Sequence, residues 1–357
     1  MGDQKIKRIN FVINSLNRGG TETQLLYLIK SLKTDYKISL FSFSSGSMND
    51  LFKKENINIV TGKKYFGLIS FLIFIFKNKA DIYHFFLPKS YIIGASLTFF
   101  LDVKKIMSRR SLNNYHKKYF YLSLFIEKYL HKRMDLILTN SNVIKNQIER
   151  TENVDEKKVK VIKNFVLKKK IFLKKKKKSV KKNIIYVANF FRYKRHLELV
   201  DICSSLNVKK RWQLFFVGSD RDTNYSEIKK KIEYYNLHHN IKFLGEIQKV
   251  DDIYRKMDFA LSASSEEGSS NFLLESISNC LPILAFDVGG NKDFFDKNGF
   301  IIPKNDFQTF KDKLEYLINE DDLSTMRKNS FGLILKKFNN KTSISIYKKS
   351  YEGLLKN

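Results

Sequence analysis

Residues 262–275 read SASSEEGSSNFLLE, and this segment gives the strongest indication of the architecture. An apolar run at residues 259–262 predicts a buried strand, and the pattern that begins near Asn271 predicts a helix. The turn between them is rich in serine and holds Gly268, so a ligand can come close to the backbone there. Backbone N–H groups at a helix start attract anions. The segment therefore predicts a strand–turn–helix unit with a ligand site in its turn.

Two carboxylates, Glu267 and Glu275, stand eight positions apart within this segment. Carboxylates accept strong hydrogen bonds from hydroxyl groups, which suits a phosphate ligand flanked by hydroxyls, such as a nucleotide sugar. The alternative is that both are surface carboxylates that the helix dipole favours. Their combination with small residues and a helix start favours the ligand site.

Outward from this segment, short apolar runs alternate with helical patterns along the whole chain. This alternation predicts βαβ units and therefore an α/β fold with parallel sheets. The expected strands are residues 9–13, 37–43, 81–86, 105–108 and 135–139 in the first half, and 183–188, 213–217, 241–243, 259–262 and 282–286 in the second. A chain of 357 residues has room for two such domains.

A basic block separates the two series of strands. Residues 157–195 contain 17 Lys or Arg and no acidic residue, and like charges in such a block resist packing. We expect an N-terminal Rossmann-like domain at 1–166, a basic linker at 167–182, a C-terminal Rossmann-like domain at 183–340 and, at 341–357, a helix packing back toward the first domain. Two such domains are expected to face a central cleft, with ligands at the carboxyl ends of the strands.

Composition excludes several classes of protein. Hydrophobic residues make up 43% of the chain, which excludes global disorder. Two cysteines without a Cys/His cluster give neither a disulfide framework nor a zinc site, and they fit a reducing cytoplasm. The net charge of +30 attracts polyanions or anionic membranes, unless it is compositional drift.

Residues 65–76 form an apolar run between Lys63, Lys64 and Lys77. The run is too short to span a bilayer, which needs about 20 residues. No export signal is visible, so we expect a cytoplasmic protein. The favoured interpretation of the run is a buried helix. The alternative is a helix whose exposed side rests on an anionic membrane, on the inner face of the cytoplasmic membrane.

A glycine turn follows the first expected strand, where residues 18–24 read RGGTETQ. Gly19 and Gly20 allow close approach of a ligand, and Thr21 with Gln24 has the spacing of a capping box. The helix end would suit a phosphate. Taken alone, the turn is best interpreted as an ordinary strand–helix connection.

Together these motifs resemble the group-1 retaining glycosyltransferases of GT-B fold. The segment EEGSSNFLLES resembles their signature of two glutamates separated by seven residues. The further matches, in the family's order, are RGGTE at 18–22, DIYH at 81–84, VIKN at 161–164, VGS at 217–219, FLG at 243–245, and PIL with DVGGN at 282–291. The resemblance covers nearly the whole chain.

The resemblance implies roles for the matched residues. The C-terminal domain would bind a nucleotide sugar and the N-terminal domain its acceptor. Glu275 would hold the ribose, Glu267 the transferred sugar, Lys194 the diphosphate, and backbone near Gly245 the base. The wider set expected to bind substrate comprises Gly19, Gly20, Thr21, Asn189, Arg192, Gly268, Ser269, Ser270, Asn271, Phe272 and Leu273. No metal or cofactor is implied.

The chain departs from the family pattern at three positions. Asn189 replaces an arginine, and Arg192 is the candidate substitute. Cys280 occupies a position that is often glycine, which we interpret as a packing change. Arg109 stands near the place of a histidine that faces the sugar, so it joins Glu267 and Lys194 as a catalytic candidate.

The histidines and one acidic loop complete the candidates. His84, at a strand end, is as consistent with a structural role as with a catalytic one. His116 and His196 are not expected to be catalytic. Asp220 and Asp222 form a DxD pattern, but the match around them favours a plain loop without metal.

The expected activity is transfer of a hexose or N-acetylhexosamine, with retention, from a UDP-sugar to a lipid-linked or cell-envelope glycan. One alternative is a protein that binds nucleic acid or an anionic surface, although no nucleic-acid-binding motif is present and no nucleic acid partner is expected. Another is a catalytically inactive member of the family.

Overall fold

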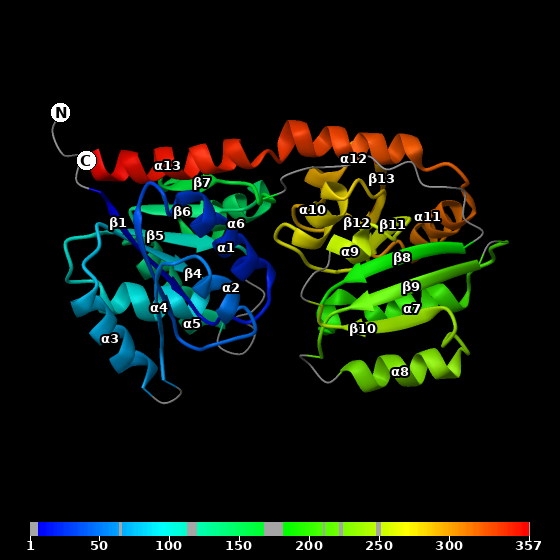
Figure 1. Ribbon diagram of the computed structural model, residues 1–357, viewed down its shortest axis with the longest axis horizontal. Helices are drawn as coiled ribbons and strands as arrows, with labels where there is room; N and C mark the ends of the chain where they lie inside the picture. Colours follow the sequence, from blue (N-terminus) through cyan, green and yellow to red (C-terminus); the bar gives the residue numbers. More distant parts are fainter. Residues whose placement is uncertain are drawn as a thin grey trace. The chain divides into compact units, whose positions relative to one another are not determined.

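The computed structural model describes residues 6–63, 66–112, 120–167, 181–209, 211–220, 224–247 and 251–356. The chain forms two compact units (Figure 1). Unit 1 consists of Met1–Leu167 and Asn340–Asn357, and unit 2 of Lys168–Asn339. Most of the expected linker, residues 168–180, lies outside the described residues.

Unit 1 is built on a seven-stranded sheet in the order β3-β2-β1-β4-β5-β6-β7. Every neighbouring pair is parallel. The strands are β1 (Arg8–Ile13), β2 (Lys37–Ser42), β3 (Asn58–Thr61), β4 (Ile82–Phe86), β5 (Lys104–Arg109), β6 (Leu136–Thr139) and β7 (Val159–Val161). Apolar side chains point to both faces of the central strands, so each face needs a layer of helices.

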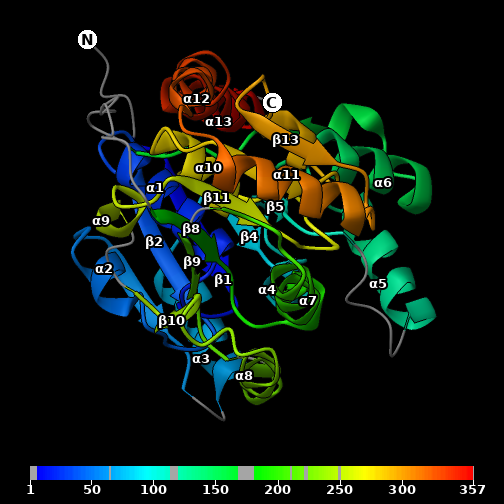
Figure 2. The same cartoon turned by 90° about the vertical axis from the view of Figure 1, so that its right-hand side faces the viewer.

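Two apolar cores fill the space between this sheet and its helices. One contains side chains of α1 (Gly20–Leu32), α2 (Asn49–Lys53) and α13 (Asn340–Lys356). The other contains side chains of α3 (Gly67–Lys77), α4 (Pro88–Leu97), α5 (Phe120–Lys132) and α6 (Asn142–Glu152). Figures 1 and 2 accordingly show α13 and α3 on opposite sides of unit 1. The last helix of the chain is thus part of the first unit.

Unit 2 has a six-stranded sheet in the order β10-β9-β8-β11-β12-β13, again with parallel pairs throughout. Its strands are β8 (Lys181–Val187), β9 (Arg211–Val217), β10 (Ile241–Gly245), β11 (Phe259–Ser262), β12 (Ile283–Phe286) and β13 (Gly299–Ile302). Its helices are α7 (His196–Ser204), α8 (Asn224–Tyr234), α9 (Asp251–Tyr254), α10 (Asn271–Ser278), α11 (Phe307–Asn319) and α12 (Ser324–Lys337). The strand order reverses between β8 and β11, which is where such sheets bind ligands.

The ten strands expected from the sequence are all present, and their ends differ from the expected ones by at most two residues. The sequence reasoning missed β3, β7 and β13. All three lie at sheet edges, are three or four residues long, and are only partly buried. Short, half-exposed edge strands carry little hydrophobic pattern, which explains the omission.

Helix α3 corrects the expectation of a buried helix at residues 65–76, of which Tyr65 lies outside the described residues. Only Phe71, Phe74 and Ile75 are buried. The exposed apolar side chains are Phe66, Leu68, Ile69, Leu72, Ile73 and Phe76. Among the described residues, every helix is too short or too polar to cross a bilayer.

Candidate functional site

A lysine–glutamate pair lies at the carboxyl edge of the sheet in unit 2. Lys194 follows β8 in a short 3₁₀ turn, and Glu267 lies in the turn after β11. The Nζ atom of Lys194 is 2.5 Å from Oε1 of Glu267. Because β8 and β11 are neighbours in the sheet, their following turns meet although 73 positions separate the two residues. The sequence analysis named both as catalytic candidates, and the structure brings them together.

The environment of Lys194 keeps its ammonium group charged. Burial acts to lower the pKa of Lys194, but the Glu267 carboxylate and the hydroxyls of Tyr193 and Tyr186 raise it above its ordinary value. The ammonium also lies 4.9 Å from the ring centroid of Tyr193. The side chains of Lys194 and Glu267 retain 16% and 13% exposure, so a ligand can reach a pre-positioned cation and carboxylate.

Two glycines hold the turn that carries Glu267. Gly289 has a φ of +55°, and a Cβ atom there would lie 1.6 Å from the carbonyl oxygen of Glu267, so only glycine fits. The N–H of Gly290 donates to the carbonyl of Gly268 at 3.0 Å. The turn after β12 therefore clasps the turn after β11.

The Lys194 segment is tied to the same turn from the other side. The N–H of Ser265 donates to the carbonyl of Tyr193 at 2.8 Å. The buried hydroxyl of Tyr186, on β8, donates to the carbonyl of Lys194 at 2.8 Å and contacts the Ser264 hydroxyl at 3.0 Å. Burial raises the pKa of Tyr186 to about 12, so this hydroxyl keeps its proton. The backbone of both functional residues is thereby fixed.

Helix α10 presents the second glutamate. Glu275 is half-buried, and its Oε2 accepts a hydrogen bond from the hydroxyl of Tyr254 at 3.1 Å. Tyr254 is fully buried, and burial followed by the charge of Glu275 raises its pKa well above 10. Tyr254 therefore always donates, and it orients the carboxylate of Glu275.

The start of α10 divides the remaining candidates into two groups. Gly268, Ser269 and Asn271 are partly exposed, as a binding role requires. The other three have buried side chains. Ser270 is buried and its hydroxyl accepts from the N–H of Leu273 at 3.3 Å, capping the helix. The side chains of Phe272 and Leu273 point into the core, so only the backbone of these two residues can face a ligand.

The turns after β8 and β9 and the end of β10 are connected by hydrogen bonds. The side-chain oxygen of Asn189 accepts from the N–H and the hydroxyl of Ser219, both at 3.1 Å. The N–H of Gly218 donates to the carbonyl of Gly245 at 3.0 Å. Gly245 is exposed with a φ of +68°. Asn189 thus shapes the turn beside it, and Gly245 offers accessible backbone.

Arg192 does not join the Lys194–Glu267 pair. Its guanidinium lies 3.2 Å from Oε1 of Glu227, on α8, and its side chain is 68% exposed. The charge of Arg192 is directed to a surface carboxylate, and its substitution for the family's arginine stays a prediction. Arg221 and Asp222 of the DxD pattern, like His116, lie outside the described residues.

The glycine turn of unit 1 is arranged differently from the expected capping box. Helix α1 begins at Gly20, with Gly19 as its extended N-cap and Thr21 already inside the helix. The side chain of Gln24 does not reach back. It instead donates to the carbonyl of Phe165 at 2.8 Å and accepts from the N–H of Phe165 at 3.0 Å. Gln24 therefore joins α1 to the segment that ends the first part of unit 1.

His84 has a structural role, and its catalytic assignment is wrong. The imidazole is fully buried and bonded at both nitrogens, Nδ1 to the Tyr351 hydroxyl at 2.9 Å and Nε2 to the Ser108 hydroxyl at 2.8 Å. Burial, followed by the charge of Arg110, holds the pKa of His84 well below 6.5. A neutral ring with both nitrogens engaged is not available to a sugar.

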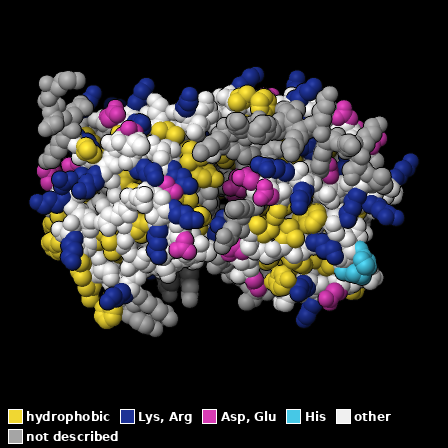
Figure 3. Space-filling view, viewed as in Figure 1, with side chains coloured by type: hydrophobic (Ala, Val, Ile, Leu, Met, Phe, Trp, Pro, Cys, Tyr) yellow, Lys and Arg dark blue, Asp and Glu magenta, His cyan; other side chains and the backbone are white. Residues whose placement is uncertain are grey.

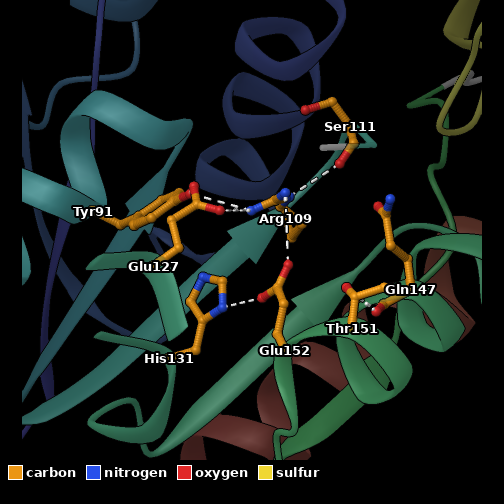
Figure 4. Close-up of polar contacts among 8 residues, drawn as sticks. All are labelled: Tyr91, Arg109, Ser111, Glu127, His131, Gln147, Thr151 and Glu152. Atoms are coloured by element: carbon orange, nitrogen blue, oxygen red, sulfur yellow. Dashed lines mark hydrogen bonds and ion pairs between the residues drawn. The ribbon is translucent and has the colours of Figure 1, made fainter. Parts of the chain in front are cut away.

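Arg109 is likewise a correction, because it is 1% exposed and lies within a buried polar cluster (Figure 4). Its guanidinium contacts Glu127 at 3.1 Å, the Tyr91 hydroxyl at 3.2 Å and Glu152 at 3.9 Å. Tyr91 also bonds to Glu127, and His131 to Glu152. The residue was expected near the sugar, but its guanidinium is instead enclosed by polar side chains inside unit 1.

One arginine faces two buried carboxylates in this cluster. Burial, and then the charge of Glu152, raises the pKa of Glu127 to about 9. Glu127 is therefore protonated at neutral pH and joins Arg109 as a hydrogen-bonded carboxyl rather than as an ion. The cluster connects β5, α5 and α6 through buried polar contacts.

His196 fits the expectation that it is not catalytic. It is 2% exposed and packs among Tyr186, Phe190 and Phe216. Burial, with the charge of Lys194, lowers its pKa to about 3.

Sequence reasoning assigned no role to Gly289, Tyr186 or Tyr254. The two glycines at 289–290 were a usable signal, whereas no local pattern marks the two tyrosines.

Two family models match the chain in succession. Residues 18–166 match Glycosyltransferase Family 4, and residues 168–330 match Glycosyl transferases group 1. The two matches together account for most of both structural units. Their boundary at 166–168 coincides with the division between the units.

Three similar proteins come from Staphylococcus aureus. Protein CapJ is 31% identical over 141 residues, which is 38% of this chain and 34% of CapJ. A poly(ribitol-phosphate) alpha-N-acetylglucosaminyltransferase is 28% identical over 203 residues, 53% of this chain and 40% of that protein. The capsular polysaccharide biosynthesis glycosyltransferase CapH is 24% identical over 331 residues, 85% of this chain and 90% of CapH. The first two matches thus span less than half of each relative.

The crystal structure of Anabaena HepE in complex with UDP-glucose has the same fold. The TM-score is 0.85 at 17% identity, covering 97% of this chain and 99% of HepE. The chain therefore has the GT-B fold, with one parallel sheet in each of its two units. The consecutive family matches, the shared fold and the juxtaposed Lys194 and Glu267 lead to one conclusion: the chain belongs to the group 1 glycosyltransferases and is an enzyme of GT-B fold.

Proposed function

We propose that this enzyme transfers a hexose or N-acetylhexosamine, with retention of configuration, from a UDP-sugar to a lipid-linked or cell-envelope glycan. The names of the staphylococcal relatives, a capsular polysaccharide enzyme and a polyribitol-phosphate enzyme, support such an acceptor. The UDP-glucose bound to HepE supports the donor. Unit 2 is proposed to bind the donor and unit 1 the acceptor.

The Lys194–Glu267 pair is the observation that carries this proposal. In the transfer, the bond between the anomeric carbon and the diphosphate breaks, and the acceptor oxygen bonds to the same face of that carbon. The acceptor hydroxyl gives its proton to the departing diphosphate. Negative charge grows on the diphosphate as the bond breaks, and an ammonium fixed at Lys194 stabilises it increasingly toward the transition state.

The carboxylates of Glu267 and Glu275 accept hydrogen bonds from the hydroxyl groups of the UDP-sugar. Glu267 is held beside the ammonium by the clasp of Gly289 and Gly290, which suits contact with the transferred sugar. Glu275 is oriented by Tyr254, which suits the two ribose hydroxyls. Lys194 supplies the positive charge that the diphosphate needs, and on this basis we propose that no metal cofactor takes part.

A panel of nucleotide sugars tests the donor. The expected result is a rise in melting temperature with UDP-sugars and slow hydrolysis of one of them, since a ligand that binds only the folded state stabilises it. Stabilisation by oligonucleotides but by no nucleotide sugar would contradict the proposal. Added EDTA is expected to leave hydrolysis unchanged, and loss of activity that a divalent metal restores would contradict the metal-free mechanism.

The anomeric configuration of the product tests retention. NMR of the new linkage should show the same anomeric configuration as in the donor sugar. An inverted centre would overturn the proposed stereochemistry while leaving the donor assignment intact.

A further inference from the structure

Helix α3 exposes an apolar stripe on its outer side. Ile69, Leu72, Ile73 and Phe76 follow the spacing of one helix face, and all four are exposed, Phe76 by 81%. The opposite side of the helix fills the core of unit 1 through Phe71, Phe74 and Ile75. A helix that is apolar on both sides is normally covered on both. The outer stripe therefore needs a partner.

A second apolar group lies near the end of this helix. Phe99 and Phe100, in the turn after α4, are 37% and 91% exposed. The N–H of Lys104 donates to the carbonyl of Asp81 at 3.1 Å, so the segment after α3 and the segment after α4 run side by side into β4 and β5. Both helices also contribute to the same core. We call the exposed side chains of α3, with Phe99 and Phe100, the α3 face.

The charges along α3 itself have one sign, whereas Asp102, two residues after Phe100, is an exposed acidic residue beside the α3 face. Residues 56–80 contain no Asp or Glu, whereas Lys63 precedes the helix and Lys77 and Lys79 follow its apolar stripe. Figure 3 shows apolar side chains at the lower left edge of unit 1, where Figure 1 places α3, with basic side chains beside them. An apolar surface bordered by cations is complementary to a surface that offers hydrocarbon beneath a layer of anions.

We propose that unit 1 docks on an anionic lipid bilayer through the α3 face. Helix α3 has 11 residues, so it lies in the headgroup region instead of crossing the membrane. Phe76 and Phe100 enter the boundary of the acyl chains, and the stems of Lys77 and Lys79 extend toward the lipid phosphates. The inference rests on the proposed function in one respect, because a lipid-linked acceptor would be held in the same bilayer.

A second copy of this chain fits the α3 face less well. A symmetric dimer brings the same patch together from both copies, so Lys63, Lys77 and Lys79 would face their own equivalents. The net charge of +30 adds to this repulsion and favours an anionic surface. Charge complementarity therefore selects the lipid surface.

Vesicle flotation of the full chain, without nucleotide sugar or acceptor, tests the docking. The chain should float with vesicles of phosphatidylcholine and phosphatidylglycerol, several-fold less at high salt, and not with phosphatidylcholine alone. The double variant Ile69→Glu/Ile73→Glu should lower the partition coefficient about tenfold or more. The matched control Tyr234→Glu/Leu335→Glu changes exposed apolar positions of unit 2, 79% and 55% exposed, and should float like the wild type.

Further measurements keep the test decisive. Circular dichroism and the melting temperature show whether the α3 variant folds. If it does not, Lys77→Gln/Lys79→Gln serves instead and should reduce the preference for anionic vesicles. Equal flotation of wild type and variants, or indifference to lipid charge, would overturn the proposal. So would a wild-type dimer in light scattering that Ile69→Glu/Ile73→Glu makes monomeric. Vesicle binding without turnover of any nucleotide sugar would instead refute the proposed function alone.

Discussion

The imidazole of His84 and the hydroxyl of Tyr351 share a 2.9 Å hydrogen bond across 267 positions of sequence. The other ring nitrogen is hydrogen-bonded to the hydroxyl of Ser108, so the imidazole connects β4, β5 and α13. The ion pair of Lys348 with Asp35, at 2.5 Å, adds a second attachment of α13 at the surface. His84 therefore anchors the last helix to the sheet of unit 1.

Removing the hydroxyl in Tyr351→Phe should lower the free energy of unfolding by about 1–3 kcal/mol, because a buried ring nitrogen of His84 loses its partner. Urea denaturation measures the change. Tyr347→Phe is the control on the same helix, since its hydroxyl forms no hydrogen bond within the described part of the chain and its ring remains in the core. Equal effects of both substitutions would show that the His84 bond contributes nothing specific.

Gly289→Ala should reduce turnover about 10²-fold, because the added methyl group forces the Glu267 turn to move. Gly332→Ala, in α12, places the same methyl group where no atom lies within 4 Å. It should leave turnover unchanged and stabilise the helix by up to about 1 kcal/mol. Steady-state kinetics and thermal unfolding of both variants check the pair. Wild-type turnover in Gly289→Ala would contradict the proposal that the turn after β12 holds the turn of Glu267 in place.

Lys194→Ala should lower kcat by about 10²–10³-fold and change KM for the donor less, since the ammonium acts mainly on charge that develops in the transition state. Lys231→Ala is the matched control, because Lys231 also forms a 2.5 Å ion pair in unit 2, with Asp201. That variant should keep its kcat. An effect of Lys194→Ala on KM alone would indicate simple attraction of the bound diphosphate.

Glu275→Gln should weaken donor binding by about 1.5–3 kcal/mol, the range for a hydrogen bond to a charged group. The substitution keeps an oxygen that can accept from Tyr254, so the fold should survive. Calorimetric titration with the donor measures the loss. Glu315→Gln changes a carboxylate of unit 2 that binds the N–H of Asn207, and it should not alter affinity. Unchanged affinity in Glu275→Gln would refute the ribose assignment.

Glu127 should make the wild-type protein less stable as pH rises. Its folded pKa of about 9 exceeds the unfolded value of 4.5, so the folded state holds this proton more tightly. The free energy of unfolding therefore falls as pH rises between these two pKa values. Between pH ~7 and pH ~9 the contribution of Glu127 to this loss is about 2–3 kcal/mol. Glu127→Gln, which imitates the protonated form, should remove that loss. Urea denaturation across the pH series tests it, and an unchanged slope would contradict the assignment.

The site candidates that the structure brings together at one edge of the sheet belong to local motifs. Lys194, Glu267 and Gly268 lie in turns directly after apolar strands, and neighbouring parallel strands bring such turns to one edge. At Cys280 the structure adds a backbone feature that the interpretation as a packing change did not include. Its φ of +58° is a conformation that favours glycine, which accounts for the glycine expected there by resemblance.

The wrong predictions concern residues whose roles depend on distant partners. Nothing near His84 in the sequence indicates that Tyr351 covers it, and nothing near Arg109 indicates Glu127 and Glu152. For α3, an apolar composition alone cannot distinguish a helix buried on both sides from one that keeps Ile69 and Ile73 exposed. Burial is a property of the tertiary structure, so the roles of His84, Arg109 and α3 could be assigned only from that structure.

The return of α13 to unit 1 also sets an order for folding during synthesis. Tyr347 and Tyr351 complete a core whose other members, such as Ile9, Phe11 and Leu25, leave the ribosome more than 300 residues earlier. Unit 2 is continuous in sequence and is complete before α13 emerges. Unit 1 therefore cannot complete its core during synthesis until unit 2 has been made, and until then one face of its sheet is incompletely covered.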